Sequence, residues 1–160
     1  MKNLSLFKIF ILLFISNFFE SLLAPFFIIL NIIVPVTFLF FSFIAYSSRT
    51  NFNAITSFVL GIYVDLISDS FFGLNAILFS LSSFVINSYS NTFKLFSYLQ
   101  ICIFFGISST FYIGFLNLFI NVQNFSYPVL FVSFIFNTFL CLILSMSKFY
   151  VPNLSINKRI

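Results

Sequence analysis

Charged side chains are nearly absent from this chain, and that scarcity limits its possible folds more than any other feature. Only 6% of its residues are charged and 61% are hydrophobic, whereas an ordinary soluble domain is roughly 25% charged. One bilayer crossing takes about 20 predominantly apolar residues, so a chain of 160 residues has room for at most about six crossings. The sequence therefore predicts an all-α integral membrane protein and excludes a soluble globular domain.

Apolar runs, separated by the rare charges and by Pro and Asn clusters, divide the chain into six predicted transmembrane helices within a single domain, 1–160. The predicted spans are 4–23, 26–46, 52–67, 73–89, 96–120 and 128–147. The third and fourth are short, so we expect this pair either to tilt or to re-enter without crossing fully. Lys2 and Lys8 before an apolar run resemble a secretory signal, but a suitable cleavage site does not follow. We therefore expect the first span to be retained.

The basic residues test both the number and the direction of the crossings, because cytoplasmic loops of membrane proteins carry an excess of Lys and Arg. Six crossings place all seven basic residues on one face of the membrane, and one crossing more or fewer in the middle would divide them. They are Lys2, Lys8, Arg49, Lys94, Lys148, Lys158 and Arg159. We therefore expect cytoplasmic N- and C-termini. The basic residues on the cytoplasmic face, which would lie next to anionic lipid, account for the net charge of +4. This charge therefore does not indicate nucleic-acid binding.

Small and polar residues recur every four positions on three of the predicted spans. The stripes are Ser57 and Gly61, then Gly106, Thr110 and Gly114, then Ser133 and Asn137. Apolar burial does not distinguish a partner helix from lipid, so such stripes predict packing seams between helices. Pro35 removes one backbone donor and frees the carbonyl group of Asn31, which predicts a kink in the second span.

The chain has only three acidic residues, Glu20, Asp65 and Asp69, and each is expected near the outer end of its span. A carboxylate at mid-membrane depth costs about 2.5 to 3.5 kcal/mol on insertion scales and usually marks a function or a partner. Asp69 precedes a serine and fits ordinary turn chemistry. Asp65 is deeper and could face the interior of the helix bundle, where Glu20 could meet it.

Catalysis and metal binding are not expected. The chain has no His and only two Cys residues, so the side chains that build zinc sites and His-based catalysis are largely missing. An aspartyl protease needs two carboxylates that converge on one water. Asp65 and Asp69 are four positions apart, which stacks them along one helix face. We therefore predict no catalytic, cofactor or metal site.

A stretch of 16 residues that begins at Gly61 and ends at Ala76 resembles the signature region of the rod shape-determining protein MreD family. Its sequence is Gly-Ile-Tyr-Val-Asp-Leu-Ile-Ser-Asp-Ser-Phe-Phe-Gly-Leu-Asn-Ala. The family pattern has a Gly, an Asp four residues later, and a Gly-Leu turn into the next helix. Asn75 stands where the family often has His. Gly61, Asp65, Asp69, Gly73 and Asn75 are therefore candidate structural or partner-binding residues, with Glu20 as a sixth.

The resemblance implies a noncatalytic subunit of the bacterial cell-elongation complex in the inner membrane. Its partners would be MreC and, directly or indirectly, the glycan polymerase and transpeptidase that build sidewall peptidoglycan. Proteins of this family are similar in helix arrangement to the substrate-binding subunits of energy-coupling-factor vitamin transporters. Such a transporter subunit is the alternative function. In a subunit of the cell-elongation complex, Gly61 would allow close helix approach, Asp65 would cap or hydrogen-bond across the bundle, and Gly73 would permit the turn.

Overall fold

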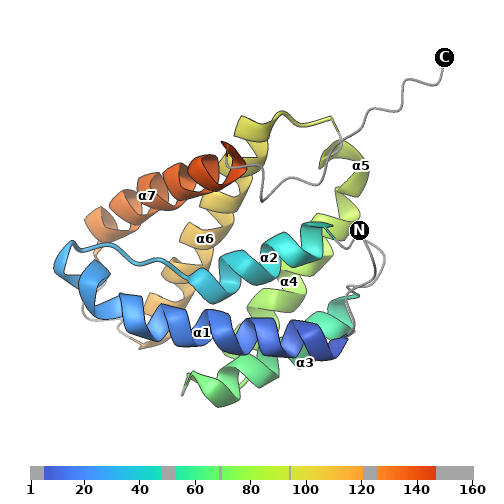
Figure 1. Ribbon diagram of the computed structural model, residues 1–160, viewed down its shortest axis with the longest axis horizontal. Coiled ribbons are helices and arrows are strands. Elements are labelled where there is room, and N and C mark those ends of the chain that lie inside the picture. The colour runs from blue at the N-terminus through green and yellow to red at the C-terminus, as the bar shows by residue number, and fades with distance from the viewer. Residues whose placement is uncertain (1–5, 48–52, 69, 94, 121–125, 147–160) are drawn as a thin grey trace.

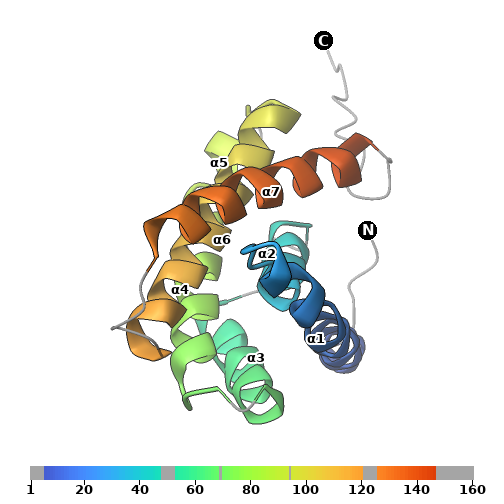
Figure 2. The ribbon, with the colours of Figure 1, turned by 90° about the vertical axis from the view of Figure 1, so that its left-hand side faces the viewer.

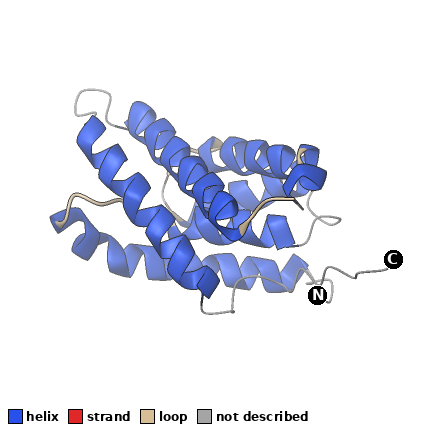
Figure 3. Cartoon of the chain, turned by 90° about the horizontal axis from the view of Figure 1, so that it is seen from above, coloured by secondary structure: helices blue, strands red, loops and turns tan. Residues whose placement is uncertain are grey.

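The structure, a computed structural model, describes residues 6–47, 53–68, 70–93, 95–120 and 126–146. Within these ranges all the regular secondary structure is helical, with seven helices and no strand (Figure 3). They are α1 (Leu6–Ile29), α2 (Val36–Ser47), α3 (Ala54–Ile67), α4 (Leu74–Ser88), α5 (Ser90–Phe93), α6 (Tyr98–Ile120) and α7 (Tyr127–Met146). The six longer helices follow the six expected apolar segments in order, whereas the single-turn α5 was not expected.

Two helices of the described chain are long and apolar enough to cross a membrane, α1 and residues Leu99–Phe119 of α6. Four further apolar helices are shorter, Val36–Tyr46, Ala54–Ile67, Leu74–Ser88 and Tyr127–Ile143. The six longer helices run alternately leftward and rightward in Figure 1. The most extensive interfaces join α3 to α4 and α6 to α7, so the chain is built largely from antiparallel helical hairpins.

The end of α1 corrects the expected boundary between the first two segments. The helix continues through Pro25 to Ile29, because a proline in an apolar helix removes only one hydrogen bond, and membrane helices tolerate that loss. It ends where Asn31 adopts a left-handed conformation with φ of 55°. The N–H group of Ile32 donates to the carbonyl oxygen of Phe27 at 3.0 Å. This is a Schellman-type C-cap, for which Asn is the usual alternative to Gly.

The kink expected at Pro35 is instead a complete break. Residues 32–35 are non-helical, and α2 begins directly after Pro35 at Val36. A proline cannot donate to the preceding turn, and it also disfavours helical geometry in the residue before it. The left-handed Asn31 and Pro35 together therefore separate the two helices.

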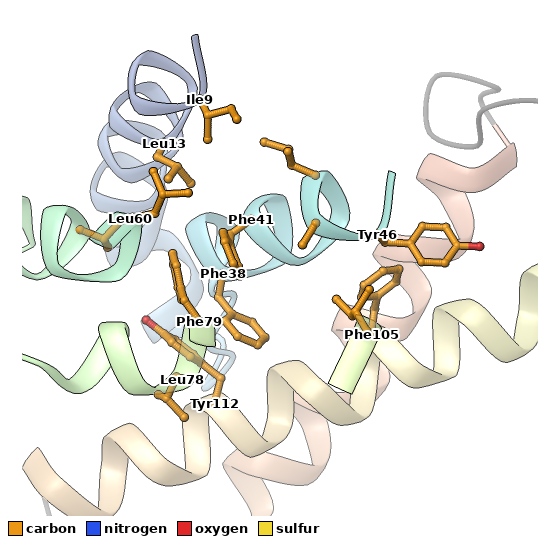
Figure 4. Close-up of a cluster of buried hydrophobic side chains, with 14 of the residues drawn as sticks. Ile9, Leu13, Phe38, Phe41, Tyr46, Leu60, Leu78, Phe79, Phe105 and Tyr112 are labelled. Atoms are coloured by element: carbon orange, nitrogen blue, oxygen red, sulfur yellow. The ribbon is translucent and has the colours of Figure 1, made fainter. Parts of the chain in front are cut away.

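The short helix α2 lies at the centre of the molecule. It contacts α1, α4 and α6, and in Figure 2 it is partly enclosed by a curved wall made of α3, α4, α6 and α7. Its Phe38 ring stacks on Tyr112 with centroids 4.4 Å apart, and its Phe41 ring stacks on Phe79 at 4.1 Å (Figure 4). Leu13 of α1 is fully buried in the same cluster. Aromatic packing on α2 therefore joins the helices of the core.

Two of the small-residue stripes are seams between helices of this chain, as the sequence predicts. A Cβ atom at Gly61 would lie 2.6 Å from the carbonyl oxygen of Asn75 on α4. A Cβ atom at Gly106 would collide with Thr138 on α7. Gly114 is less constrained, because a Cβ atom there would lie 3.9 Å from its nearest neighbour, a methyl group of Leu130.

The substitution Gly61→Ala should lower the free energy of unfolding by about 1 to 3 kcal/mol, the usual cost of overpacking. The neighbour at Gly61 is the backbone of α4, which cannot rotate away. Titration of the purified protein with SDS in mild detergent, followed by circular dichroism, measures this change. Gly114→Ala is the matched control and should change the value by less than about 0.5 kcal/mol. Equal effects of the two substitutions would contradict the close approach of α3 and α4.

Candidate functional site

The most highly connected polar side chain in the described structure is Asp65, in the last turn of α3, which is only 3% exposed. Its Oδ2 accepts hydrogen bonds from the N–H groups of Gly73 at 2.9 Å and Ala76 at 3.4 Å. Its Oδ1 accepts from the N–H group of Asn75 at 3.0 Å and from the hydroxyl of Ser70 at 2.8 Å. Asn75 and Ala76 lie in the first turn of α4 and Gly73 lies directly before it, so none of these three N–H groups has a partner within the helix. Asp65 therefore caps the N-terminus of the next helix.

Two glycines make this geometry possible. Gly73, the residue before α4, has φ of 94°, a left-handed conformation that a side chain would strain. Gly61 lies one helical turn before Asp65 and lets the backbone of α4 approach α3 closely. The chain can therefore turn sharply and bring the open end of α4 against the carboxylate.

The surroundings of Asp65 explain how a carboxylate is accommodated there. The N-terminus of a helix carries a partial positive charge that stabilises an anion. An unpaired N–H group in lipid would cost several kcal/mol, since no water is present to bond it. A carboxylate offers about four acceptor positions, and here four donors of the chain occupy them. The arrangement fits holding two helices together better than activating a water molecule.

A hydrogen-bonded chain extends this cluster to a third helix. The hydroxyl of Tyr112 on α6 donates to Oδ1 of Asn75, and Nδ2 of Asn75 donates to Oγ of Ser70 at 3.1 Å. Ser70 in turn donates to Asp65. We call Asp65, Ser70, Asn75 and Tyr112 the Asp65 cluster. Through it, α6 is joined to the turn between α3 and α4.

The sequence predicted four candidate residues that the structure places together at this turn, Gly61, Asp65, Gly73 and Asn75. It missed Ser70 and Tyr112. A signal for Tyr112 was available, because this tyrosine lies in the middle of a predicted span, whereas membrane tyrosines usually gather at the interfaces. Asp69 lies outside the described residues.

Glu20 does not join the Asp65 cluster. Its Oε2 accepts a hydrogen bond from the N–H group of Thr37, in the first turn of α2, at 2.8 Å. Glu20 therefore caps α2 from α1, as Asp65 caps α4 from α3. Glu20 lies farther from the end of its helix than expected, because α1 continues for nine residues after it, to Ile29. That length is about 14 Å of helix.

The polar stripe on α7 binds the break between α1 and α2. The N–H group of Ile33 donates to Oγ of Ser133 at 2.9 Å, and Nδ2 of Asn137 donates to the carbonyl oxygen of Ile33 at 3.3 Å. Both side chains are fully buried. Non-helical backbone at membrane depth needs such internal partners. The polar stripe on α7 therefore stabilises the break between α1 and α2.

Removal of one hydroxyl tests the link between α6 and the turn. Tyr112→Phe leaves Oδ1 of Asn75 without its donor, and an unsatisfied buried acceptor costs about 1 to 3 kcal/mol. The same SDS titration should show a loss of this size. Tyr63→Phe is the control, because Tyr63 packs by its ring against Phe10 and should change little. Equal stability of Tyr112→Phe and the native chain would mean that the cluster does not include α6.

Comparison with known proteins places this geometry in context. A protein-family model described as rod shape-determining protein MreD matches residues 1–151 of the 160-residue chain. The match covers all seven described helices and the whole Asp65 cluster. No curated protein and no solved structure matches the chain.

Proposed function

The chain belongs to the rod shape-determining protein MreD family, and from this premise we propose that it is a noncatalytic subunit of the cell-elongation complex of rod-shaped bacteria. Family membership supports a role in determining rod shape, and together with the apolar helices it identifies a membrane protein. The finer assignment is a multi-pass protein of the bacterial inner membrane that binds MreC. It would thereby help to organise sidewall peptidoglycan synthesis by the glycan polymerase and transpeptidase.

The proposed topology has six spans with both termini in the cytoplasm. Two observations support it. The long helices reverse direction one after another in Figure 1. All seven basic residues of the sequence lie before α1, in its first turn, in the connections between α2 and α3 and between α5 and α6, or after α7. Two long helices separate each of these places from the next. If every long helix crosses the membrane, these places would therefore share one face, which the charge rule would make cytoplasmic.

The Asp65 cluster is the main structural support for the proposed mechanism. It lies in the stretch that resembles the family signature, and its hydrogen bonds hold α3, α4 and α6 in one geometry. We propose that this fixed geometry presents the helix surfaces that MreC binds. The subunit would act by positioning and stabilising its partners, without making or breaking a covalent bond. The comparisons give no support to the transporter alternative.

Substitution of the two aspartates separates this role from ordinary turn chemistry. Asp65→Ala leaves the first turn of α4 uncapped, a change that costs about 0.5 to 2 kcal/mol at a water-exposed helix end and more where water is scarce. It should impair rod shape in growing cells and reduce the recovery of MreC in mild detergent. Asp65→Asn, which keeps the side-chain size, should show a smaller loss of both. Asp69→Ala is the control and should do much less.

Membrane abundance of each variant is measured alongside, so that loss of protein is distinguished from loss of binding. Equal tolerance of Asp65→Ala and Asp69→Ala would contradict the role of the Asp65 cluster. Recovery of a stoichiometric vitamin and an ATPase module with the native chain, in place of MreC, would overturn the assignment itself.

A further inference from the structure

A hollow of about 510 Å³ lies between α1 and the C-terminal end of α3, outside the Asp65 cluster. Asn17, Glu20 and Ser21 of α1 and Ser68 after α3 supply its polar lining. Phe14 and Phe18 line its apolar part, and both residues are more than half exposed. The hollow therefore combines polar groups with an apolar border on the outside of the helix bundle.

The polar groups of the hollow lie deep in α1. Asn17, Glu20 and Ser21 come eight to twelve residues before the last residue of this 24-residue helix, which is about 12 to 18 Å along its axis. Half of a typical hydrocarbon core is about 15 Å. If α1 crosses the membrane with Ile29 at the outer boundary of the hydrocarbon core, these side chains lie near its centre, beyond the ordinary reach of lipid headgroups.

The described part of the chain supplies only some of the hydrogen bonds that these polar side chains can make. Ser21 donates to the carbonyl oxygen of Phe18, and Oε2 of Glu20 accepts from Thr37. The described residues make no hydrogen bond to the side-chain amide of Asn17. Lys8 is the sole basic residue in the described ranges, and it lies twelve residues before Glu20 on the same helix, about 18 Å away.

We propose that this hollow is the docking site for a transmembrane helix of a partner protein, one that carries a hydrogen-bond-donating side chain at mid-membrane depth. A Lys or Arg side chain, or the amide of Asn or Gln, complements the carboxylate of Glu20 and the amide of Asn17. Polar side chains exposed at this depth are costly and are usually paired across helices. Phe14 and Phe18 provide the apolar contact.

The depth and the negative charge of Glu20 favour this partner over two alternative occupants, a lipid headgroup and a second copy of this chain. A lipid headgroup lies at the interface, too far from Glu20 to bond it. A second copy of this chain, packed in parallel through α1, would bring Glu20 against Glu20, and two like charges in a low-dielectric environment repel. A helix of a different protein meets both conditions.

The inference rests on the proposed function, because the partner helix is expected to belong to the cell-elongation complex. A photoreactive phenylalanine analogue placed at position 18 of the full chain, in living cells, tests it directly. The control is position 139 on α7, whose native Phe is exposed to nearly the same extent, 59% against 57%. Illumination should crosslink position 18, but not position 139, to a peptide from the transmembrane segment of another protein. That segment should carry a donor side chain within one helical turn of the crosslink.

Two substitutions show whether the polar groups carry the contact. Asn17→Leu should reduce the yield of this crosslink roughly three- to tenfold, the usual range for one interhelical hydrogen bond. Glu20→Gln should also reduce it, since the amide keeps an acceptor for Thr37 but removes the charge. Asn17 caps no helix, so its substitution keeps the test independent of folding at α2.

Three results would overturn the inference. They are a crosslink to lipid or to a second copy of the chain, a partner segment without a donor side chain, or an unchanged yield in both variants. If MreC is still recovered with the chain in any of these cases, the proposed function stands and the docking site alone is wrong. If neither MreC nor a crosslinked helix is recovered, both fail.

Discussion

The fold depends on satisfying the open ends of short helices where water is scarce. The first turn of a helix has backbone donors without partners, and in lipid each one left unpaired costs several kcal/mol. This chain meets the need with carboxylates from neighbouring helices, Asp65 for α4 and Glu20 for α2. Each carboxylate is in turn stabilised by the positive end of the helix that it caps. Two of the three acidic residues in the sequence therefore have a structural purpose.

The same constraint explains how the remaining helices are attached. The break between α1 and α2 exposes backbone groups that Ser133 and Asn137 of α7 bind. Tyr112 of α6 reaches the turn between α3 and α4 through Asn75. Close helix contact at Gly61 supplements these polar links. A few hydrogen bonds, placed where helices begin or end, thus specify an arrangement that apolar contacts alone would leave open, because lipid offers equivalent contacts.

The sequence predicted the helical segments well because the apolar runs are long and clearly separated. It misplaced the end of α1, since Pro25 is a strong breaking signal in water, whereas the real stop depends on the left-handed conformation of Asn31. The turn residues Gly61, Asp65 and Gly73 could be found because they are close in sequence. Tyr112 is 37 residues from Asn75, and only the packing of α6 against α4 brings the two together. The cap formed by Glu20 could not be predicted either, because Glu20 reaches the first turn of α2 only through the break before that helix.

Amide hydrogen exchange measured by NMR on the full chain in detergent micelles tests the central claim, that a carboxylate of α3 closes the first turn of α4. In the native chain the N–H groups of Gly73 and Asn75 should be protected. Asp65→Asn should speed their exchange roughly five- to thirtyfold, as expected for the loss of about 1 to 2 kcal/mol of capping. The N–H group of Thr37, which Glu20 caps, should be unaffected and serves as the internal reference. Unchanged exchange at Gly73 and Asn75 would contradict the account.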